Sequence, residues 1–383
     1  MKRSTERILT THTGSLPRPD DLIALVRQKE AGELGDSAAL EARVRSAVAE
    51  TVRRQLEAGI DIVNDGEMSK PSYSTYVKDR LSGFEGSEKS APLFAADLTD
   101  FRDFTKRGGR ESGVGVLKRP ACTGPIAYRD KDAVRKDAEN LKAALAGANP
   151  AEAFITAASP GVVTFFLSNK HYPSHEAYIR AIAEAMKTEY EAICAAGFIL
   201  QVDCPDLAMS RHIQFKDLSL AEFRKTIAMH IEALNHALSN VPPDRARIHL
   251  CWGNYEGPHH HDVALREIID IIFTTRAMGI SYEASNPRHE HEWAVFKDVK
   301  LPDGKLLIPG VVDSVTNFIE HPELVAQRIC NLANVVGREN VIAGSDCGFG
   351  TIAGTSRVDG AIAWAKLKAM AEGARLASKQ LWK

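Results

Sequence analysis

The feature that most constrains the fold is an alternation of short apolar runs with longer segments of helical period. Repeated units of this kind build a parallel sheet flanked by helices. Eight units indicate an α/β protein with a (β/α)8 TIM-barrel fold, whereas an open doubly wound sheet would need a glycine-rich turn after its first strand. The expected strands are 7–11, 60–64, 153–159, 198–203, 246–251, 279–283, 307–311 and 341–345.

Several of the intervening segments have the apolar periodicity of amphipathic helices. A glycine just beyond such a segment is typical of a helix C-terminus, because glycine readily adopts the left-handed conformation found there. Three expected helices end in this way: 38–58 before Gly59, 175–196 before Gly197, and 262–277 before Gly279.

The interval between the second and third expected strands is exceptionally long. Residues 67–152 far exceed an ordinary crossover, and apolar runs within them favour a folded subregion over a disordered insert. We therefore expect one domain over residues 1–383 that carries an inserted subregion. Such insertions usually act as lids or oligomer contacts, so a homo-oligomer is among the expected assemblies.

Composition excludes several classes of partner. The 383 residues are 44% hydrophobic and 26% charged, with a net charge of −2, which gives no basic surface for nucleic acid or anionic lipid. No apolar run reaches 18 residues, and the amino end lacks the apolar region of a signal peptide. Six scattered cysteines fit no disulfide framework. A cytoplasmic protein that acts on small molecules is expected.

Four residues with metal-binding side chains stand at the carboxyl ends of expected strands. His249 and Cys251 lie two positions apart, so a strand points both to the same face. Glu283 ends another expected strand, and Cys347 follows a third. Two thiolates, an imidazole and a carboxylate match a four-coordinate Zn²⁺ site. The alternative, two buried cysteines near an unrelated histidine and glutamate, does not explain why all four stand at strand ends.

Further polar residues follow nearly every expected strand, as they do at the catalytic face of barrels. Glu67 and Asp203 are expected to hold a cationic group of a metal-bound substrate. Asp313 is a candidate catalytic residue, although an aspartate after a strand also caps helices. The run His259-His260-His261 is interpreted as a polar loop ahead of a helix capped by Asp262, rather than as a metal site.

The chemistry of the proposed metal shell favours thiol alkylation. Hydrolytic zinc sites usually use histidine and carboxylate ligands, which leave enough positive charge to acidify water. A shell with two thiolates and a glutamate is a weak Lewis acid for carbonyls. It can still bind a substrate thiol as its anion and leave the sulfur able to attack carbon.

Seven motifs together resemble the single-barrel branch of the cobalamin-independent methionine synthase family. In order they are THTGSLPRP, NDGE, LQVDCPD, IHLCW, YEAS, PGVVD and SDCG. The resemblance implies that Ser15 binds the carboxylate of homocysteine and that Glu67 and Asp203 bind its amino group. It assigns zinc to His249, Cys251, Glu283 and Cys347. The chain is also similar to epoxyalkane:coenzyme M transferases, which share this architecture and activate a different thiol in the same manner.

Two departures from the family pattern bear on the alkyl donor. The chain has Asp203-Cys204-Pro205 where the synthases have D-E-P, and Asp313-Ser314-Val315 where they place a proton-delivering histidine. We therefore expect a zinc-dependent thiol alkyltransferase with a methyl donor, or alternatively an enzyme that adds coenzyme M to an epoxide. The latter needs a cationic clamp, for which Arg18 and Arg288 are the candidates. A zinc hydrolase and a structural zinc barrel are the hypotheses from other classes.

Overall fold

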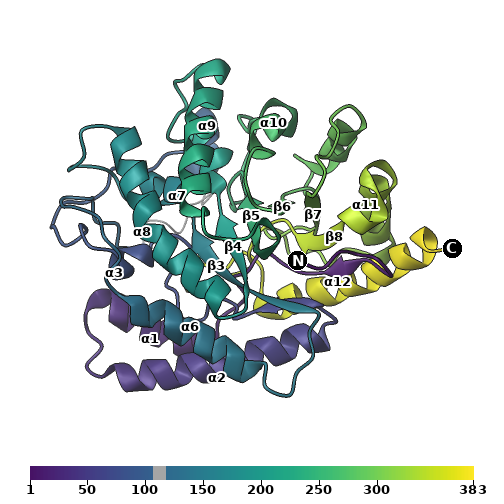
Figure 1. Cartoon of the computed structure of the whole chain (residues 1–383), viewed down its shortest axis with the longest axis horizontal. Coiled ribbons are helices and arrows are strands. Elements are labelled where there is room, and N and C mark those ends of the chain that lie inside the picture. The colour runs from purple at the N-terminus through teal and green to yellow at the C-terminus, as the bar shows by residue number, and fades with distance from the viewer. Residues whose placement is uncertain (107–117) are drawn as a thin grey trace.

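The computed structural model describes residues 1–106 and 118–383 and contains eight parallel strands arranged as a barrel (Figure 1). Neighbouring strands follow the order β1-β8-β7-β6-β5-β4-β3-β2. The TIM-barrel prediction is confirmed, and every expected strand is present. The strands are β1 Leu9–Thr10, β2 Ile62–Asn64, β3 Glu152–Ala158, β4 Ile199–Asp203, β5 Ala246–Leu250, β6 Gly279–Tyr282, β7 Leu306–Val312 and β8 Ile342–Ser345.

The barrel is nearly closed at the seam between its first and second strands. No ladder joins β1 to β2 in the described residues, but the backbone N–H of Asp61 donates to the carbonyl of Thr10 at 3.2 Å. The Asp61 carboxylate in turn accepts from the Thr10 N–H at 2.9 Å. These bonds hold the two edges together without a regular ladder.

Helices surround the strands (Figure 1). The α-helices are α1 Asp20–Ala31, α2 Ser37–Glu57, α3 Val77–Arg80, α4 Ala96–Asp100, α5 Arg102–Lys106, α6 Lys131–Ala144, α7 Pro160–Phe166, α8 His175–Ala195, α9 Leu220–Ala237, α10 Ile269–Ile272, α11 Pro322–Val336 and α12 Gly360–Leu381. Short 3-10 helices are η2 Pro205–Leu207, η3 Met209–His212, η4 Pro243–Arg245, η5 Leu265–Glu267, η6 Glu290–Lys297 and η7 Arg338–Asn340. None of the described helices combines the length and apolar character needed to cross a bilayer.

The core has an outer and an inner layer. The outer layer packs apolar strand side chains against the helices. The inner layer is a small apolar cluster in the barrel, to which Phe154 and Ile308 belong. Beside it lies Arg247, fully buried, whose guanidinium is 3.7 Å from the centre of the Phe154 ring and donates to Gln201 Oε1 and to Thr11 Oγ1. The barrel interior is therefore packed, which leaves the carboxyl-terminal mouth as the place for a site.

The glycines after α2 and α8 end these helices as expected. Gly59 and Gly197 have φ values of 85° and 95°, which L-residues with a side chain rarely adopt. The next N–H reaches back to close the helix: Ile60 donates to the Gln55 carbonyl at 3.0 Å in α2. In α8 the equivalent bond from Phe198 has a length of 3.3 Å. Both ends are Schellman motifs.

The prediction of one helix over residues 262–277 is wrong. The segment contains only η5 and the short α10. Asp262, expected to cap the helix, instead accepts hydrogen bonds from Arg288 at 2.7 Å and interacts with His289 at 3.2 Å. The N–H of Leu265 donates to Glu292 Oε1 at 2.7 Å. The Asp262 carboxylate and the Leu265 N–H, which could have started a continuous helix, thus bind side chains distant in the sequence.

The long interval between β2 and β3 carries short helices. α3, α4 and α5 precede α6, which packs against α2 and α8. Its interpretation as a subregion inserted into a single domain of residues 1–383 stays a prediction.

We predict that Gly197→Ala lowers the free energy of unfolding by about 1 kcal/mol, because an alanine resists the left-handed conformation. No atom lies within 4 Å of the added Cβ, so backbone strain is the only expected cause. Urea denaturation measures the change. Gly35→Ala is the control, since Gly35 has equal space and no positive φ; an equal loss in both variants would contradict the prediction.

Candidate metal centre at the mouth of the barrel

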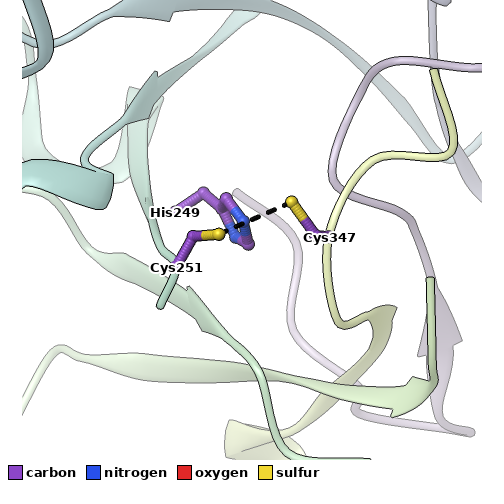
Figure 2. A group of neighbouring side chains, drawn as sticks. All are labelled: His249, Cys251 and Cys347. Carbon is purple, nitrogen blue, oxygen red and sulfur yellow. Dashed lines mark hydrogen bonds between the residues drawn. The ribbon is translucent and has the colours of Figure 1, made fainter. Parts of the chain in front are cut away.

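Three of the predicted ligands converge at the carboxyl end of the strands. His249 belongs to β5, Cys251 follows it, and Cys347 follows β8. Their ligand atoms all lie within 4.8 Å of one another, and the two sulfurs are 3.7 Å apart. Figure 2 shows the three side chains pointing toward one another. We call this group the His-Cys-Cys cluster.

The imidazole of His249 is held in the orientation that a metal ligand needs. Its Nδ1 lies 3.1 Å from the hydroxyl of Ser281 on β6, while its Nε2 is buried and has no hydrogen-bond partner. Burial lowers the pKa of His249 to about 4, so the ring is neutral near pH 7. A neutral imidazole with one oriented nitrogen and one open nitrogen matches the ligand form.

The two thiols also fit a divalent metal. All six cysteines lie in the described residues and are free thiols. The hydrogen bond with Cys347, together with burial, raises the pKa of Cys251. Without a cation the Cys251 thiol is therefore protonated at neutral pH. A bound metal reverses this preference, because it coordinates the thiolate.

Glu283, the predicted fourth ligand, lies outside the His-Cys-Cys cluster and already has partners. Its Oε1 accepts from the Trp252 N–H at 2.8 Å, and its Oε2 accepts from Asn286 at 2.9 Å and from Arg288 at 2.6 Å. Burial raises the pKa of this carboxyl, but Arg288 and His289 outweigh it and hold the pKa below its usual range. Glu283 is thus an ionised neighbour of the cluster, and its role as a zinc ligand stays a prediction.

Both arginines considered as a sulfonate clamp have protein partners on their terminal nitrogens, and only Nε of Arg18 is buried without a partner among the described residues. Arg288 binds Glu283, Asp262 and His259. Arg18 is buried and donates to the carbonyls of Gly350, Glu67 and Lys70, which braces the loops after β2 and β8. Both arginines hold the mouth of the barrel together and are committed to protein partners.

The three consecutive histidines divide into two kinds. His260 and His261 are exposed and share the Asp100 carboxylate, at 3.0 and 2.7 Å, as a polar loop would. His259 is buried: its Nε2 contacts the Tyr255 carbonyl at 2.9 Å, and its Nδ1 lies 2.8 Å from Arg288. The interpretation as a polar mouth loop therefore describes only the second and third histidines.

Glu67 and Asp203 lie in the same cavity as the cluster. Gln201 donates to Asp203 at 2.8 Å, and Thr156 donates to Glu67 Oε1 at 3.0 Å, whereas Glu67 Oε2 is buried without a partner. Burial and the charge of Glu67 raise the pKa of Asp203 well above its usual range. Lys70 is near, but its ammonium donates to Thr156. The carboxylates thus form a pair with capacity for another cation.

The backbone at Glu67 is strained. Its φ is 58°, a left-handed value that is uncommon for a residue with a long side chain. Gly66 has φ 66°, and the Asp65 carboxylate accepts from the Glu67 N–H at 2.9 Å, which stabilises this turn. Strained residues of this kind concentrate at functional sites, where the surrounding structure enforces them.

The other two predicted site residues lie in different surroundings. Ser15 lines the cavity, and its hydroxyl lies so close to Gly348 that a Cβ there would come within 2.0 Å. Asp313 is not among the cavity-lining residues. Its carboxylate accepts from the N–H groups of Val315 and Thr316, both at 2.8 Å. Asp313 therefore stabilises the turn after β7 and caps no helix, because α11 begins at Pro322 with His321 as its N-cap.

Two supporting residues escaped the sequence analysis. Ser281 orients His249, and it stands two positions before Glu283, so the alternation of strand side chains could have indicated it. Asp346 accepts from the backbone N–H groups of Ala284 and Ser285, at 2.8 and 2.9 Å, and ties the loop after β6 to the residue before Cys347. No local sequence pattern reveals such a long-range brace.

The His-Cys-Cys cluster opens into a cavity of about 450 Å³, within the usual range for small-molecule sites. Ser15, Glu67 and Asp203 line it near the cluster, and residues of the segment between β2 and β3 line another part. The ligand atoms therefore lie next to space that a substrate can occupy.

Comparisons with known proteins agree with this architecture. No protein-family model matches the chain. The methionine synthase of Saccharolobus solfataricus is 24% identical over 387 residues, covering 97% of this chain and 95% of that protein. The methionine synthase of Thermococcus kodakarensis is 25% identical over 376 residues, covering 97% and 94%.

Solved structures extend the similarity to the fold. A B12-independent methionine synthase from Shewanella sp. W3-18-1, in complex with selenomethionine, superposes with a TM-score of 0.75 at 20% identity over 98% of this chain and 99% of that chain. A putative vitamin-B12 independent methionine synthase from Listeria monocytogenes gives 0.65 at 18% identity, covering 98% and 99%. The chain is a distant, full-length relative of the cobalamin-independent methionine synthase family. The resemblance to this family is thereby confirmed as distant similarity over the full length of the chain.

We predict about one tightly bound zinc per chain, lost in both Cys251→Ser and Cys347→Ser, because a serine hydroxyl is a poor replacement for a thiolate ligand. Both variants should stay folded, since the barrel core lies below the cluster. Elemental analysis with circular dichroism measures metal and fold. Cys330→Ser, in α11, should keep its zinc. Full zinc in both cluster variants would contradict the assignment.

Proposed function

We propose that the protein is a zinc-dependent methyltransferase that alkylates a thiol, with homocysteine as the first candidate. The single observation that carries the proposal is the His-Cys-Cys cluster, which opens into a cavity that also contains two buried carboxylates. The relatives named methionine synthase support it. So does the fold shared with an enzyme that is in complex with selenomethionine, an analogue of methionine.

His249, Cys251 and Cys347 would hold the zinc, with Glu283 as the fourth ligand or as a nearby carboxylate. Zinc bound there would supply a positive charge that stabilises a substrate thiolate at neutral pH. Ser281 keeps the histidine nitrogen directed at the cluster. Glu283 would coordinate most readily through Oε1, which accepts one hydrogen bond, from the Trp252 N–H, whereas Oε2 accepts bonds from both Asn286 and Arg288.

Glu67 and Asp203 would bind the amino group of the thiol substrate. Burial and the charge of Glu67 raise the pKa of Asp203, because two buried carboxylates resist simultaneous ionisation. An arriving ammonium group would offset this repulsion and favour the ionised form of Asp203. Ser15, on the same cavity wall, is placed to donate to the substrate carboxylate. Together these groups would recognise an amino acid.

The second substrate of the proposed reaction is the alkyl donor. A methyl donor is proposed because the relatives are methionine synthases. Asp313 remains the proposed catalytic residue for this substrate, although its carboxylate binds the loop at Val315 and Thr316. The alternative is an epoxide that reacts with coenzyme M. Arg18 and Arg288 do not support that alternative, because the terminal nitrogens of both guanidinium groups already bind protein partners.

A structural zinc site and a zinc hydrolase are the competing functions from other classes. A structural site is coordinatively closed and usually sealed from substrate, whereas the ligand atoms here line a cavity. A hydrolytic site would lower the pKa of water, which two thiolate ligands disfavour by reducing the charge on the metal. The cluster therefore supports thiol activation better than either.

We predict that homocysteine adds sulfur-to-metal charge-transfer absorption in the near ultraviolet to protein loaded with Co²⁺, and that binding releases a proton. Absorption spectroscopy and calorimetry in buffers of different ionisation enthalpy measure the two effects. Methionine, which has no free thiol, is the control ligand. If no thiol, including homocysteine and coenzyme M, changes the spectrum, a structural zinc becomes the better explanation.

We predict that wild type prefers homocysteine to coenzyme M by at least about tenfold, since a charge-assisted bond to the ammonium contributes about 1.5–3 kcal/mol. Asp203→Asn should remove most of this preference while retaining zinc. Competition binding measures it, with Asp100→Asn as the control because Asp100 is exposed and contacts His260 and His261 of the surface loop. Tighter binding of coenzyme M to wild type, unchanged by Asp203→Asn, would favour the epoxide reaction.

A further inference from the structure

The cavity has two chemically different parts. The part near the cluster contains Glu67 and Asp203, whereas the remaining wall is largely apolar. Part of this wall comes from the segment between β2 and β3. The apolar wall as a whole includes Leu93, Phe94, Leu98, Phe165, Met209 and Ile352, of which the first three belong to that segment. An amino-acid thiol held by Ser15 and the two carboxylates would leave this apolar wall uncovered.

Arg119 in the cavity wall carries a positive charge that no described carboxylate neutralises. Its Nη1 is buried and has no hydrogen-bond partner, and no carboxylate of residues 1–106 or 118–383 forms an ion pair with it. Burial lowers the pKa of Arg119. By contrast, Arg129 pairs with Glu85 at 2.9 Å outside this cavity.

A partly buried guanidinium without an anion is unfavourable, because water is lost and no hydrogen bond replaces it. An anionic ligand group would supply the missing partner and could form two parallel bonds with the fork of the guanidinium. Glu67 and Asp203, in the part of the cavity near the cluster, would repel the same anion. The charges thus fix the direction in which an anionic molecule binds.

We infer that the alkyl donor is a largely apolar molecule with an acidic group, and that Arg119 binds this group. This inference rests on the proposed thiol alkyltransferase function and names the class of its second substrate. The apolar wall covers the body of the donor, and the reactive carbon faces the thiolate. A sulfur–carbon bond forms as the bond from carbon to the leaving group breaks, and the leaving group departs with that electron pair.

Two fluorescent probes of nearly equal shape test the inference. Anilinonaphthalene sulfonate is an apolar anion, and phenylnaphthylamine is its neutral analogue without the sulfonate. Wild type should bind the anion about tenfold more tightly relative to the neutral probe than Arg119→Gln does. Arg119→Lys should recover part of the difference, and Arg129→Gln should behave as wild type. An unchanged ratio in Arg119→Gln overturns the inference.

A second variant shows where the probes bind. Met209→Trp fills the apolar part of the cavity and should weaken both probes by a similar factor, with circular dichroism as the check on folding. Retained affinity for the anion in this variant, if folded, also overturns the inference, because the anion then binds elsewhere.

The metal centre is tested separately. Cys347→Ser should keep the probe preference after it has lost zinc, so probe binding does not depend on the proposed function. Zinc and thiol binding without an Arg119 effect would refute only the donor class. An Arg119 effect without thiol binding would refute the alkyltransferase instead.

Discussion

The site depends on the register of three neighbouring strands. Asp203 of β4 pairs with His249 of β5, and His249 pairs with Ser281 of β6. Residues in one register row point to the same face of a sheet, so this row brings a proposed substrate carboxylate, a metal-ligand candidate and its orienting hydroxyl together. A slip of one residue would turn a whole set away from the barrel interior. The strand register therefore places these three side chains side by side, and their hydrogen bonds then fix their orientations.

The strands and the convergence of the cluster were predictable because both follow from local periodicity. Apolar runs located β1 to β8, and the spacing of His249 and Cys251 indicated a shared face. The ends of α2 and α8 were predictable for the same reason, since Gly59 and Gly197 meet a purely local backbone requirement. Parallel order then brings distant strand ends, including that of Cys347, to one mouth.

Features set by long-range partners were not predictable. The segment over 262–277 has helical periodicity, but Asp262 is taken by Arg288 and Leu265 by Glu292, and no window of sequence contains those pairings. The hydrogen bonds that occupy Glu283 are also tertiary contacts. The role of Arg119 was not predictable either, because a charge without an ion-pair partner can be recognised only when every neighbour of the side chain is known.

The left-handed backbone of Glu67 lowers the stability of the fold while it holds a carboxylate in the cavity. A non-glycine residue in this conformation costs about 1–2 kcal/mol, and glycine would relieve that strain while removing the carboxylate from the cavity. Selection for thermal resistance alone would therefore favour sequences that lose the carboxylate. The carboxylate of Glu67 is thus held in the cavity at a cost in stability that the fold of the barrel does not itself require.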